Sequence, residues 1–395
     1  MQLIVPTNWD DSLIKDLEGL KVKEVFGKLQ SDCFGGGRPS ISLPYLTKKA
    51  MIRHIKIIHE QGYKFNYLLN SACMGNVEFT RKGQKKMRKF VDFLAKSGTD
   101  SVTVAIPYLA NWINRNYPNI KVRASVVANI DSIEKAKMWD NFGVDSIVLN
   151  IDNNRSFSFL RLMKKAVKCK IVLMVNSACL YNCPLSQYHY TLVSHGSQSI
   201  HKLKGFHIDY CLMFCSWYRL TDLSQIIRSG WIRPEDLEYY EGLGINNFKI
   251  VGRDLSREKI YSIVRAYSER NYQGNLLDIL SPFAGWSSFD FKKFIRCLKY
   301  MLRPSKVNIF KLLKLRDLPK KNFIFINNEK LKGFIEGFQN RNCKQLDCSD
   351  CFYCNDIAKK VIDVDYDRLN QVKRMYKKIL EEIESGSMFT FKKAI

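Results

Sequence analysis

The sequence lacks any long hydrophobic run and any secretion signal. No stretch reaches the roughly 18 to 20 apolar residues that a membrane-spanning helix needs. Residues 1–5 resemble the start of a strand, without the basic region and the long apolar region of a signal peptide. We therefore expect a cytoplasmic protein with no membrane partner. Cysteines in the cytoplasm rarely form disulfides, so the 12 cysteines of this chain need another explanation.

Two common hydrolase motifs are also missing. His59 and Glu60 are not followed by the second histidine of an H-E-x-x-H zinc site, and the chain has no G-x-S-x-G nucleophile elbow. No motif therefore identifies a nucleophile or a catalytic metal for peptide hydrolysis.

Acidic residues are scarce relative to basic ones. The chain has 38 Asp and Glu against 63 Lys and Arg, a formal net charge of +25. This excess favours an anionic partner, such as nucleic acid, an acidic peptide or a carboxylate metabolite, although solvated lysine-rich surfaces produce the same excess. In residues 80–96, Met87, Phe90, Val91 and Leu94 recur at helical spacing, and basic residues cover much of the remainder. This pattern predicts an amphipathic helix whose basic outer face could contact RNA.

The main feature of the sequence is a regular alternation of apolar runs with segments of helical periodicity. Continuous apolar runs are typical of parallel strands buried on both faces. Eight such runs separated by helical segments predict an α/β fold, a (β/α)8 TIM-like barrel. The predicted strands are residues 2–6, 22–29, 65–70, 101–107, 122–127, 146–150, 171–176 and 247–251.

Two further features complete the predicted organisation. Residues 210–214 also resemble a strand, and we assign them to a cysteine-bearing insertion over the barrel mouth that begins near Cys179. After about residue 271 the alternation stops. We therefore predict a barrel domain of residues 1–271 and a small α-rich domain of residues 272–395 that closes with a helix at 367–384.

Polar residues end several of the predicted strands. Catalysis in such barrels takes place at the carboxyl ends of the strands, which here carry Asn70, Asn176 and Arg253. Three consecutive glycines at 35–37 allow a close backbone approach to a ligand, and Arg38 adds a bidentate donor, although a plain turn explains the same residues. We predict Arg38, Asn70, Asn176 and Arg253 as substrate-binding residues.

The first cysteine set is Cys179, Cys183, Cys211 and Cys215, two C-x3-C pairs separated by 27 residues. Four thiolates over a barrel mouth favour a 4Fe–4S cluster, and zinc or buried free thiols are the alternatives. Four of the six histidines lie between the pairs. We predict His189 and His195 as ligands or proton carriers, the alternative being exposed loop histidines.

The second cysteine set is Cys343, Cys348, Cys351 and Cys354, which follow C-x4-C-x2-C-x2-C. The C-x2-C-x2-C core matches bacterial ferredoxin spacing and favours a second 4Fe–4S cluster, with zinc as the alternative. The remaining cysteines are scattered, and we expect each to be a small buried hydrophobic residue: Cys33, Cys73, Cys169 and Cys297.

At this point the chain resembles a known family. NSACLYNCPLSQYH at 176–189 and IRSGWIRPEDLEYYEGLGINNFKIVGR at 227–253 are similar to the collagenase-like peptidases, the unclassified peptidase family thirty-two, across residues 1–270. Several bacterial members are implicated in oxygen-independent hydroxylation of ubiquinone precursors, transfer RNA or ribosomal RNA, with oxygen taken from prephenate. The resemblance implies that the first four cysteines ligate a 4Fe–4S cluster, and that Lys249 and Arg253 bind an anionic donor or substrate.

These observations give one leading hypothesis and two alternatives. The leading hypothesis is an iron–sulfur redox enzyme with two 4Fe–4S clusters that hydroxylates a small molecule, a peptide or RNA under anaerobic conditions and receives electrons from a donor protein. In it Arg38, Lys249 and Arg253 hold carboxylates, and His189 or His195 moves protons. The alternatives are a peptidase of the collagenase-like family and an RNA-binding or RNA-modifying protein.

Overall fold

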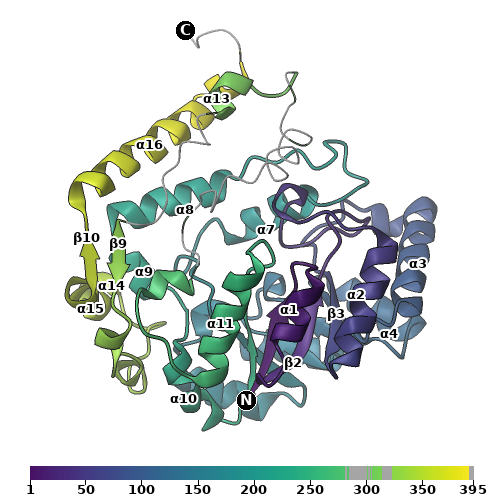
Figure 1. The fold of residues 1–395 in the computed structure, drawn as a ribbon, viewed down its shortest axis with the longest axis horizontal. Coiled ribbons are helices and arrows are strands. Elements are labelled where there is room, and N and C mark those ends of the chain that lie inside the picture. Colours follow the sequence, from purple (N-terminus) through teal and green to yellow (C-terminus); the bar gives the residue numbers. More distant parts are fainter. Residues whose placement is uncertain (281–282, 284–299, 301–302, 304, 314–322, 391–395) are drawn as a thin grey trace.

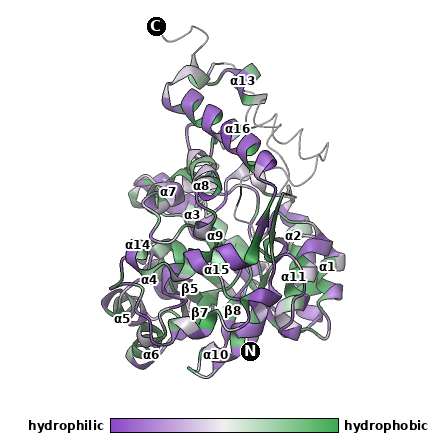
Figure 2. Ribbon diagram, turned by 90° about the vertical axis from the view of Figure 1, so that its left-hand side faces the viewer, coloured by the Kyte–Doolittle hydropathy of each residue, from purple (hydrophilic) through white to green (hydrophobic). Residues whose placement is uncertain are grey.

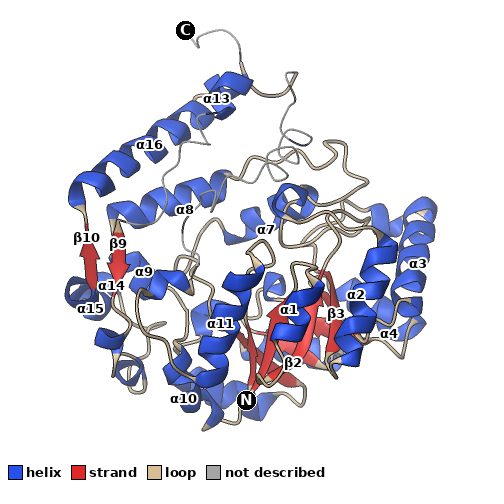
Figure 3. Cartoon of the chain, viewed as in Figure 1, coloured by secondary structure: helices blue, strands red, loops and turns tan. Residues whose placement is uncertain are grey.

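The computed structural model describes residues 1–280, 283, 300, 303, 305–313 and 323–390. Eight parallel strands form a closed barrel in sequence order, and β1 pairs with β8 to complete it (Figure 3). The predicted (β/α)8 barrel is therefore confirmed. Its strands are β1 Gln2–Pro6, β2 Val22–Gly27, β3 Lys64–Leu69, β4 Ser101–Val104, β5 Lys121–Ala124, β6 Ser146–Val148, β7 Lys170–Met174 and β8 Asn247–Lys249.

Helices follow the strands and surround the barrel. Several begin at a hydroxyl side chain that accepts a backbone N–H of the first turn, as Thr47, Thr80, Ser132 and Ser256 do. In α3 the four predicted apolar residues are buried, and its basic residues lie outward. These helices are α1 Asp11–Asp16, α2 Lys48–Glu60, α3 Arg81–Lys96, α4 Pro107–Asn116, α5 Ile133–Asn141, α6 Phe157–Ala166 and α11 Arg257–Glu269.

The inside of the barrel is apolar in its middle and charged at its amino-terminal end. Phe26, Leu68, Val172 and Met174 belong to one buried cluster. In β2, two residues before Phe26, Glu24 forms a buried ion pair with Arg123 of β5.

The long connection between β7 and β8 forms the predicted insertion. It contains α7 Ser186–His195, α8 Tyr210–Thr221, α9 Ser224–Arg228 and α10 Leu237–Glu241. The prediction of a strand at 210–214 is wrong, because these residues form the start of α8. The short apolar run fits a buried helix as well as a strand, and Asp209 caps the helix by accepting the N–H of Leu212 at 3.0 Å.

The carboxyl-terminal segment packs on this insertion (Figure 1). Helix α16 lies along α8, α15 packs on α9, and β9 pairs antiparallel with β10. Figure 2 shows a mostly hydrophobic strand β7 and many hydrophilic residues along α16. The elements are α13 Ile309–Leu313, β9 Ile324–Ile326, α14 Cys348–Cys351, α15 Tyr353–Val361, β10 Ile362–Val364 and α16 Tyr366–Glu384.

Short 3-10 helices fill several connections. They are Ser40–Ser42, Val77–Phe79, Val126–Ala128, Ile151–Asn153, Pro234–Asp236, Leu276–Asp278, Glu329–Leu331, Ile335–Phe338 and Ser387–Phe389. Of the helices in the described part of the chain, none has the length and apolar character needed to cross a membrane.

Candidate functional site

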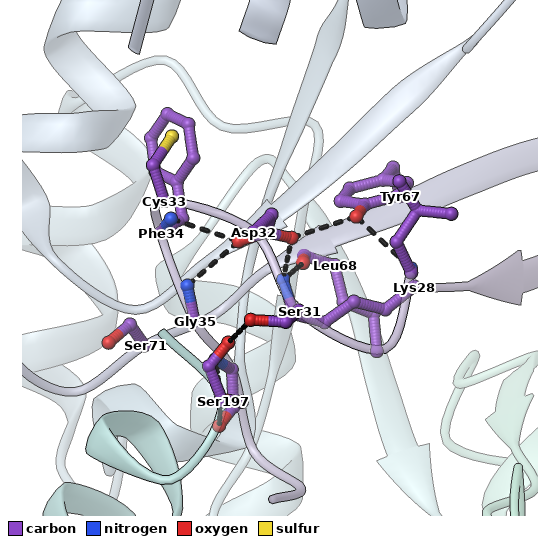
Figure 4. A network of polar contacts seen from close by, with 12 residues as sticks. Lys28, Ser31, Asp32, Cys33, Phe34, Gly35, Tyr67, Leu68, Ser71 and Ser197 are labelled. Atoms are coloured by element: carbon purple, nitrogen blue, oxygen red, sulfur yellow. Dashed lines mark hydrogen bonds and ion pairs between the residues drawn. The ribbon is translucent and has the colours of Figure 1, made fainter. Parts of the chain in front are cut away.

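A buried polar network fixes one side of the barrel mouth (Figure 4). The carboxylate of Asp32 forms an ion pair with Lys28 and accepts a hydrogen bond from the hydroxyl of Tyr67 at 2.8 Å. It also accepts hydrogen bonds from the backbone N–H groups of Phe34 at 2.9 Å and of Gly35 at 2.8 Å. The network therefore holds the start of the glycine segment against the ends of β2 and β3.

The glycines at 35–37 are needed for close packing within the protein. Gly35 has a φ of +78°, and a Cβ there would lie 2.6 Å from the carbonyl oxygen of Ser194. The N–H of Gly36 donates to Ser197 Oγ at 2.8 Å, and that of Gly37 donates to Asn70 Oδ1 at 3.3 Å. The backbone of this segment approaches the end of α7, and these N–H groups already have protein acceptors.

Three of the predicted substrate-binding cations meet at the mouth. Lys249 and Arg253 are each only 6% exposed, and Arg38 is half-buried. Burial, reinforced by Arg123 and Arg253, lowers the pKa of Lys249 to about 7. Burial and then the nearby Arg38 lower the pKa of Arg253 to about 10.

These cations lack close anionic partners. Nη1 of Arg253 is buried without a hydrogen-bond partner. The Lys249 ammonium lies 4.2 Å from the centre of the Phe26 ring. In the described ranges neither side chain forms an ion pair with a carboxylate. An unpaired buried cation is costly, so the arrangement is suited to an anionic ligand.

The two predicted asparagines have different surroundings. Asn70 accepts from Gly37 and donates to Ser125 Oγ at 3.2 Å. Asn176 donates to the carbonyls of Val251 at 3.0 Å and Ile279 at 3.3 Å, and it accepts the N–H of Val251 at 2.7 Å. Both amides therefore hold loops at the mouth, and the contacts that the structure gives them are with the protein.

The four cysteines of the first set lie together beside this mouth. Burial raises the pKa of Cys183, and the Cys179 thiolate raises it further. Burial raises the pKa of Cys211 to about 12, with added contributions from Asp209, Cys215 and Cys183. Burial raises the pKa of Cys215 to about 11, and Cys179 contributes again. Each of the four thiols thus lies close enough to influence at least one of the others, and we call the four together the barrel site.

Arg219 supplies a positive charge to the barrel site. It is 2% exposed, and its Nη1 donates to Cys215 Sγ at 3.2 Å. Its Nη2 donates to the carbonyl of Ala178, the residue before Cys179. Arg219 therefore ties α8 to the loop after β7 and stabilises the thiolate form of Cys215.

The predicted histidines fall into two separate pairs. His189 lies 3.1 Å from Asp209, and His207 contacts the same carboxylate at 3.4 Å. These two imidazoles keep the pKa of Asp209 far below its ordinary value against the opposing effect of burial. His195 instead stacks on His201, with ring centres 4.9 Å apart. Of the two predicted histidines, His189 and His195, only His189 therefore contacts Asp209, the carboxylate that caps helix α8.

The second cysteine set also comes together, and we call it the tail site. Burial raises the pKa of Cys343, and Cys351 and Cys348 raise it further. Burial raises the pKa of Cys354 to about 11, with smaller effects of Cys343 and Cys348 in the same direction. None of the eight cysteines forms a disulfide.

The tail site adjoins the barrel site. Tyr181, between Cys179 and Cys183, donates its hydroxyl to the carbonyl of Cys343 at 3.3 Å. Beside the tail site, the guanidinium of Arg155 lies 4.2 Å from the Trp231 ring and donates to the carbonyls of Ile227 and Trp231. Tyr181 therefore connects the loop of the barrel site to the backbone of the tail site.

Each set offers four free thiols, which is the donor set of a zinc ion or of a 4Fe–4S cluster. Within the described residues, no group of three or more His, Cys, Asp or Glu side chains forms a site for one metal ion. A cubane cluster holds its four thiolates farther apart than zinc does, because each thiolate binds a different iron atom. The four cysteines of the barrel site range from exposed Cys179 to buried Cys211, and Cys215 accepts a hydrogen bond from the buried Arg219.

Sequence reasoning missed several residues of these sites. Asp209 and Arg219 flank the cysteines of α8 in sequence, and this proximity was an available signal. Lys28 and Asp32 also stand only four residues apart, whereas Arg155 had no such signal, because its partners Ile227 and Trp231 are distant in sequence. Among the scattered cysteines, Cys33 and Cys169 are buried as expected, Cys73 is half-buried, and Cys297 lies outside the described residues.

Comparisons with known proteins concern most of the barrel. A family model described as peptidase family U32 matches residues 44–271. An uncharacterized protease of Methanocaldococcus jannaschii is 28% identical over 359 residues, covering 88% of this chain and 94% of that protein. A solved structure of a U32 peptidase has 21% identity and a TM-score of 0.43, over 50% of this chain and 76% of its own. The structure of phosphoribosyl anthranilate isomerase from Thermus thermophilus has 10% sequence identity and a TM-score of 0.36. The match covers 68% of this chain and 98% of that enzyme.

Proposed function

This chain belongs to peptidase family U32, and from that premise we propose that it is an iron–sulfur redox enzyme that carries out oxygen-independent hydroxylation. One observation carries the proposal: four free thiols lie beside the same barrel mouth as Lys249 and Arg253, buried cations that form no ion pair within the described residues. A peptidase needs an activated nucleophile or hydrolytic metal. Four cysteine thiols beside buried cations suit redox chemistry on a bound carboxylate donor.

Each part of the mouth has a role in this proposal. Cys179, Cys183, Cys211 and Cys215 would hold a 4Fe–4S cluster, which supplies one-electron chemistry when bound. Arg253 and Lys249 bind the carboxylates of an anionic donor such as prephenate from below, and Arg38 does so from the rim. Their burial strengthens the attraction, because the surroundings screen charge weakly.

Proton movement is assigned to the histidine next to the cysteine helix. His189 can accept or donate a proton, and Asp209 orients its ring. The stacked pair of His195 and His201 has no carboxylate partner of this kind among its described contacts. We therefore favour His189 over His195 for this role.

The tail site is proposed to hold a second 4Fe–4S cluster, with zinc as the alternative. The contact between Tyr181 and the tail site supports a role in which the two sites exchange electrons. An electron-donor protein would deliver electrons from outside. The substrate to be hydroxylated, whether small molecule, peptide or RNA, would approach over the same mouth.

A peptidase remains the second candidate, since the family and the archaeal relative carry that name. It predicts peptide cleavage that survives removal of iron. The redox proposal predicts the opposite dependence, because the barrel-site thiolates are its reaction centre.

Anaerobic purification with iron and sulfide analysis tests the proposal. We expect about eight irons per chain, falling by about half in Cys179→Ala and in Cys351→Ala. Cys33→Ala is the matched control, since this buried cysteine belongs to neither site, and it should keep the full iron content. Zinc in place of iron at the barrel site, or no metal there, would refute the redox proposal.

A further inference from the structure

Lysines close the amino-terminal end of the barrel. Alternate strands of a (β/α)8 barrel contribute four inward side chains to each layer of its interior. Side chains that face inward further along the odd-numbered strands are Ile4, Leu68, Arg123 and Val172. Strand alternation therefore places in the outermost layer Gln2 of β1, Lys64 of β3, Lys121 of β5 and Lys170 of β7. This end of the barrel lies on the side away from α7, α8 and α16 (Figure 3).

A fourth lysine, from β2, joins this layer. Lys23 donates a hydrogen bond to Oε1 of Gln2 at 2.5 Å. Burial lowers the pKa of Lys23, and the charges of Lys170 and then Lys64 lower it further. Lys64 lies on the neighbouring strand, but Lys170 lies on β7, on the other side of β1 and β8. These ammonium groups therefore gather over the barrel axis, where a single ligand can reach all of them.

One carboxylate forms the ion pairs of this lysine group, which consists of Lys23, Lys64, Lys121 and Lys170. Asp145 pairs with Lys170 at 3.0 Å and with Lys121 at 3.7 Å. Within the part of the chain that the structure describes, Lys23 and Lys64 form no ion pair. Four ammonium groups against one carboxylate leave a net charge of +3. The side chains of Lys121 and Lys170 are 59% and 50% exposed, so a dissolved anion can reach this charge.

We propose that the lysine group binds a compact oligophosphate anion, such as a triphosphate, at the amino-terminal end of the barrel. Ammonium groups are strong donors to phosphate oxygens, and a multivalent anion offsets the mutual repulsion of the four lysines. The Glu24–Arg123 pair in the next layer adds no net charge that could replace such an anion. Because the lysines gather around one axis, they fit a compact anion better than the phosphates of a nucleic acid, which are spaced along a line. This site lies at the opposite end of the barrel from the mouth, and it does not depend on the proposed function.

Calorimetric titration of the full chain with tripolyphosphate tests the site. Lys23→Gln/Lys64→Gln should lower the affinity at least about tenfold, because two charge-assisted hydrogen bonds are lost. The matched control is Lys360→Gln/Lys378→Gln, which removes the same charge from exposed positions of α15 and α16. This control should change the affinity by less than about twofold, since salt screens charges on other elements of the surface. Equal affinities in the two double variants, or no binding of tripolyphosphate to the wild-type protein, would overturn the inference.

Removal of the carboxylate should have the opposite effect. Asp145→Asn frees Lys121 and Lys170 for the ligand, and we expect the affinity to rise at least about threefold because a negative charge near the anion is lost. An affinity that falls or stays constant in Asp145→Asn, at the wild-type thermal midpoint, would contradict the site. Lys23 and Lys64 have no ion pair to lose within the described residues, so their double variant should keep or raise the thermal midpoint of the protein without ligand.

Two further comparisons distinguish this site from other anion sites. If Arg38→Gln lowers the affinity for tripolyphosphate and Lys23→Gln/Lys64→Gln keeps it, the anion binds at the mouth and the inference fails. If a single-stranded RNA oligonucleotide loses affinity in the lysine variant and tripolyphosphate does not, the ligand is an extended polyanion and the inference also fails. The iron content of the barrel site decides the proposed function alone, because the lysine group lies at the other end of the barrel.

Discussion

At the scale of single residues, Lys249 is the most informative group at the mouth. Its ammonium lies over the Phe26 ring, and both the Glu24–Arg123 ion pair and Arg253 act on its charge. Burial first, and then Arg123 and Arg253, lowers its pKa to about 7. The charge of Lys249 therefore changes within the physiological range.

This shift predicts a pH-dependent affinity for anions. Lys249 is protonated below about pH 7 and attracts a carboxylate, and it becomes neutral as the pH rises through that value. We expect the dissociation constant of the dicarboxylate prephenate, measured by calorimetry, to increase between pH 6 and 8. Lys249→Arg should bind with little pH dependence over this range, because arginine stays charged. A wild-type affinity that is flat with pH would contradict the assignment.

A second residue-scale prediction concerns the Lys28–Asp32 pair. Asp32→Asn removes the partner of a fully buried ammonium that also donates to the Leu68 carbonyl. We expect the free energy of unfolding in urea to fall by about 3–5 kcal/mol, because an uncompensated buried charge remains. Glu60→Gln breaks the exposed Lys56–Glu60 pair and should cost at most about 0.5 kcal/mol. Equal effects of the two substitutions would refute the structural role of Asp32.

At the scale of elements, α16 supports the helix that carries half of the barrel site. Its buried side chains are Leu369, Val372, Tyr376, Ile379 and Leu380. The hydroxyl of Tyr210, at the start of α8, donates to Glu384 at 2.8 Å. The terminal helix thus holds α8, with Cys211 and Cys215, from the side opposite the barrel (Figure 1).

Weakening the contact between α16 and α8 should reduce the retention of iron at the barrel site. Leu380→Ala leaves a cavity in the α16 face, and we expect a loss of about 2–5 kcal/mol in the free energy of unfolding. Because α8 then moves more freely, iron should be lost from the barrel site faster during exposure to a chelator. Lys378→Ala, on the exposed face, should change stability by less than about 0.5 kcal/mol. Unchanged iron retention in Leu380→Ala would contradict support of α8 by α16.

At the scale of the whole molecule, the net charge of +25 attracts anions over long distances. Part of this charge borders a groove between α2 and α3 of about 860 Å³. The groove is lined by Ile52, Lys85, Arg88, Lys89, Asp92, Phe93 and Lys96. Such a groove is the feature that favours the RNA alternative.

The RNA alternative makes its own prediction. A single-stranded RNA oligonucleotide should bind with an affinity that falls steeply with salt. Reversing Lys85, Lys86 and Lys89 to glutamate should lower that affinity at least about tenfold, since each lost phosphate contact weakens binding. Reversing Arg374, Lys377 and Lys378 of α16 is the matched control. An RNA affinity that does not change with salt concentration, or that is equal in the two triple variants, would refute the RNA-binding hypothesis.

Local patterns allowed much of this molecule to be predicted. All eight barrel strands were identified, because a parallel sheet buried on both faces requires continuous apolar runs. The buried face of α3 followed from helical spacing. Residues 210–214 were misassigned, since a short apolar run does not distinguish a strand from a buried helix.

By itself, then, the sequence determined the barrel and the two sets of four cysteines, because strand periodicity and cysteine spacing are local properties. Only the tertiary structure decided which charges meet. Arg38 and Arg253 come from opposite ends of the barrel sequence, and closure of β1 on β8 brings them to one mouth. The contact of Arg219 with Cys215 and the contact of Tyr181 with Cys343 depend likewise on how helices and loops pack. Packing joins residues that no sequence pattern connects.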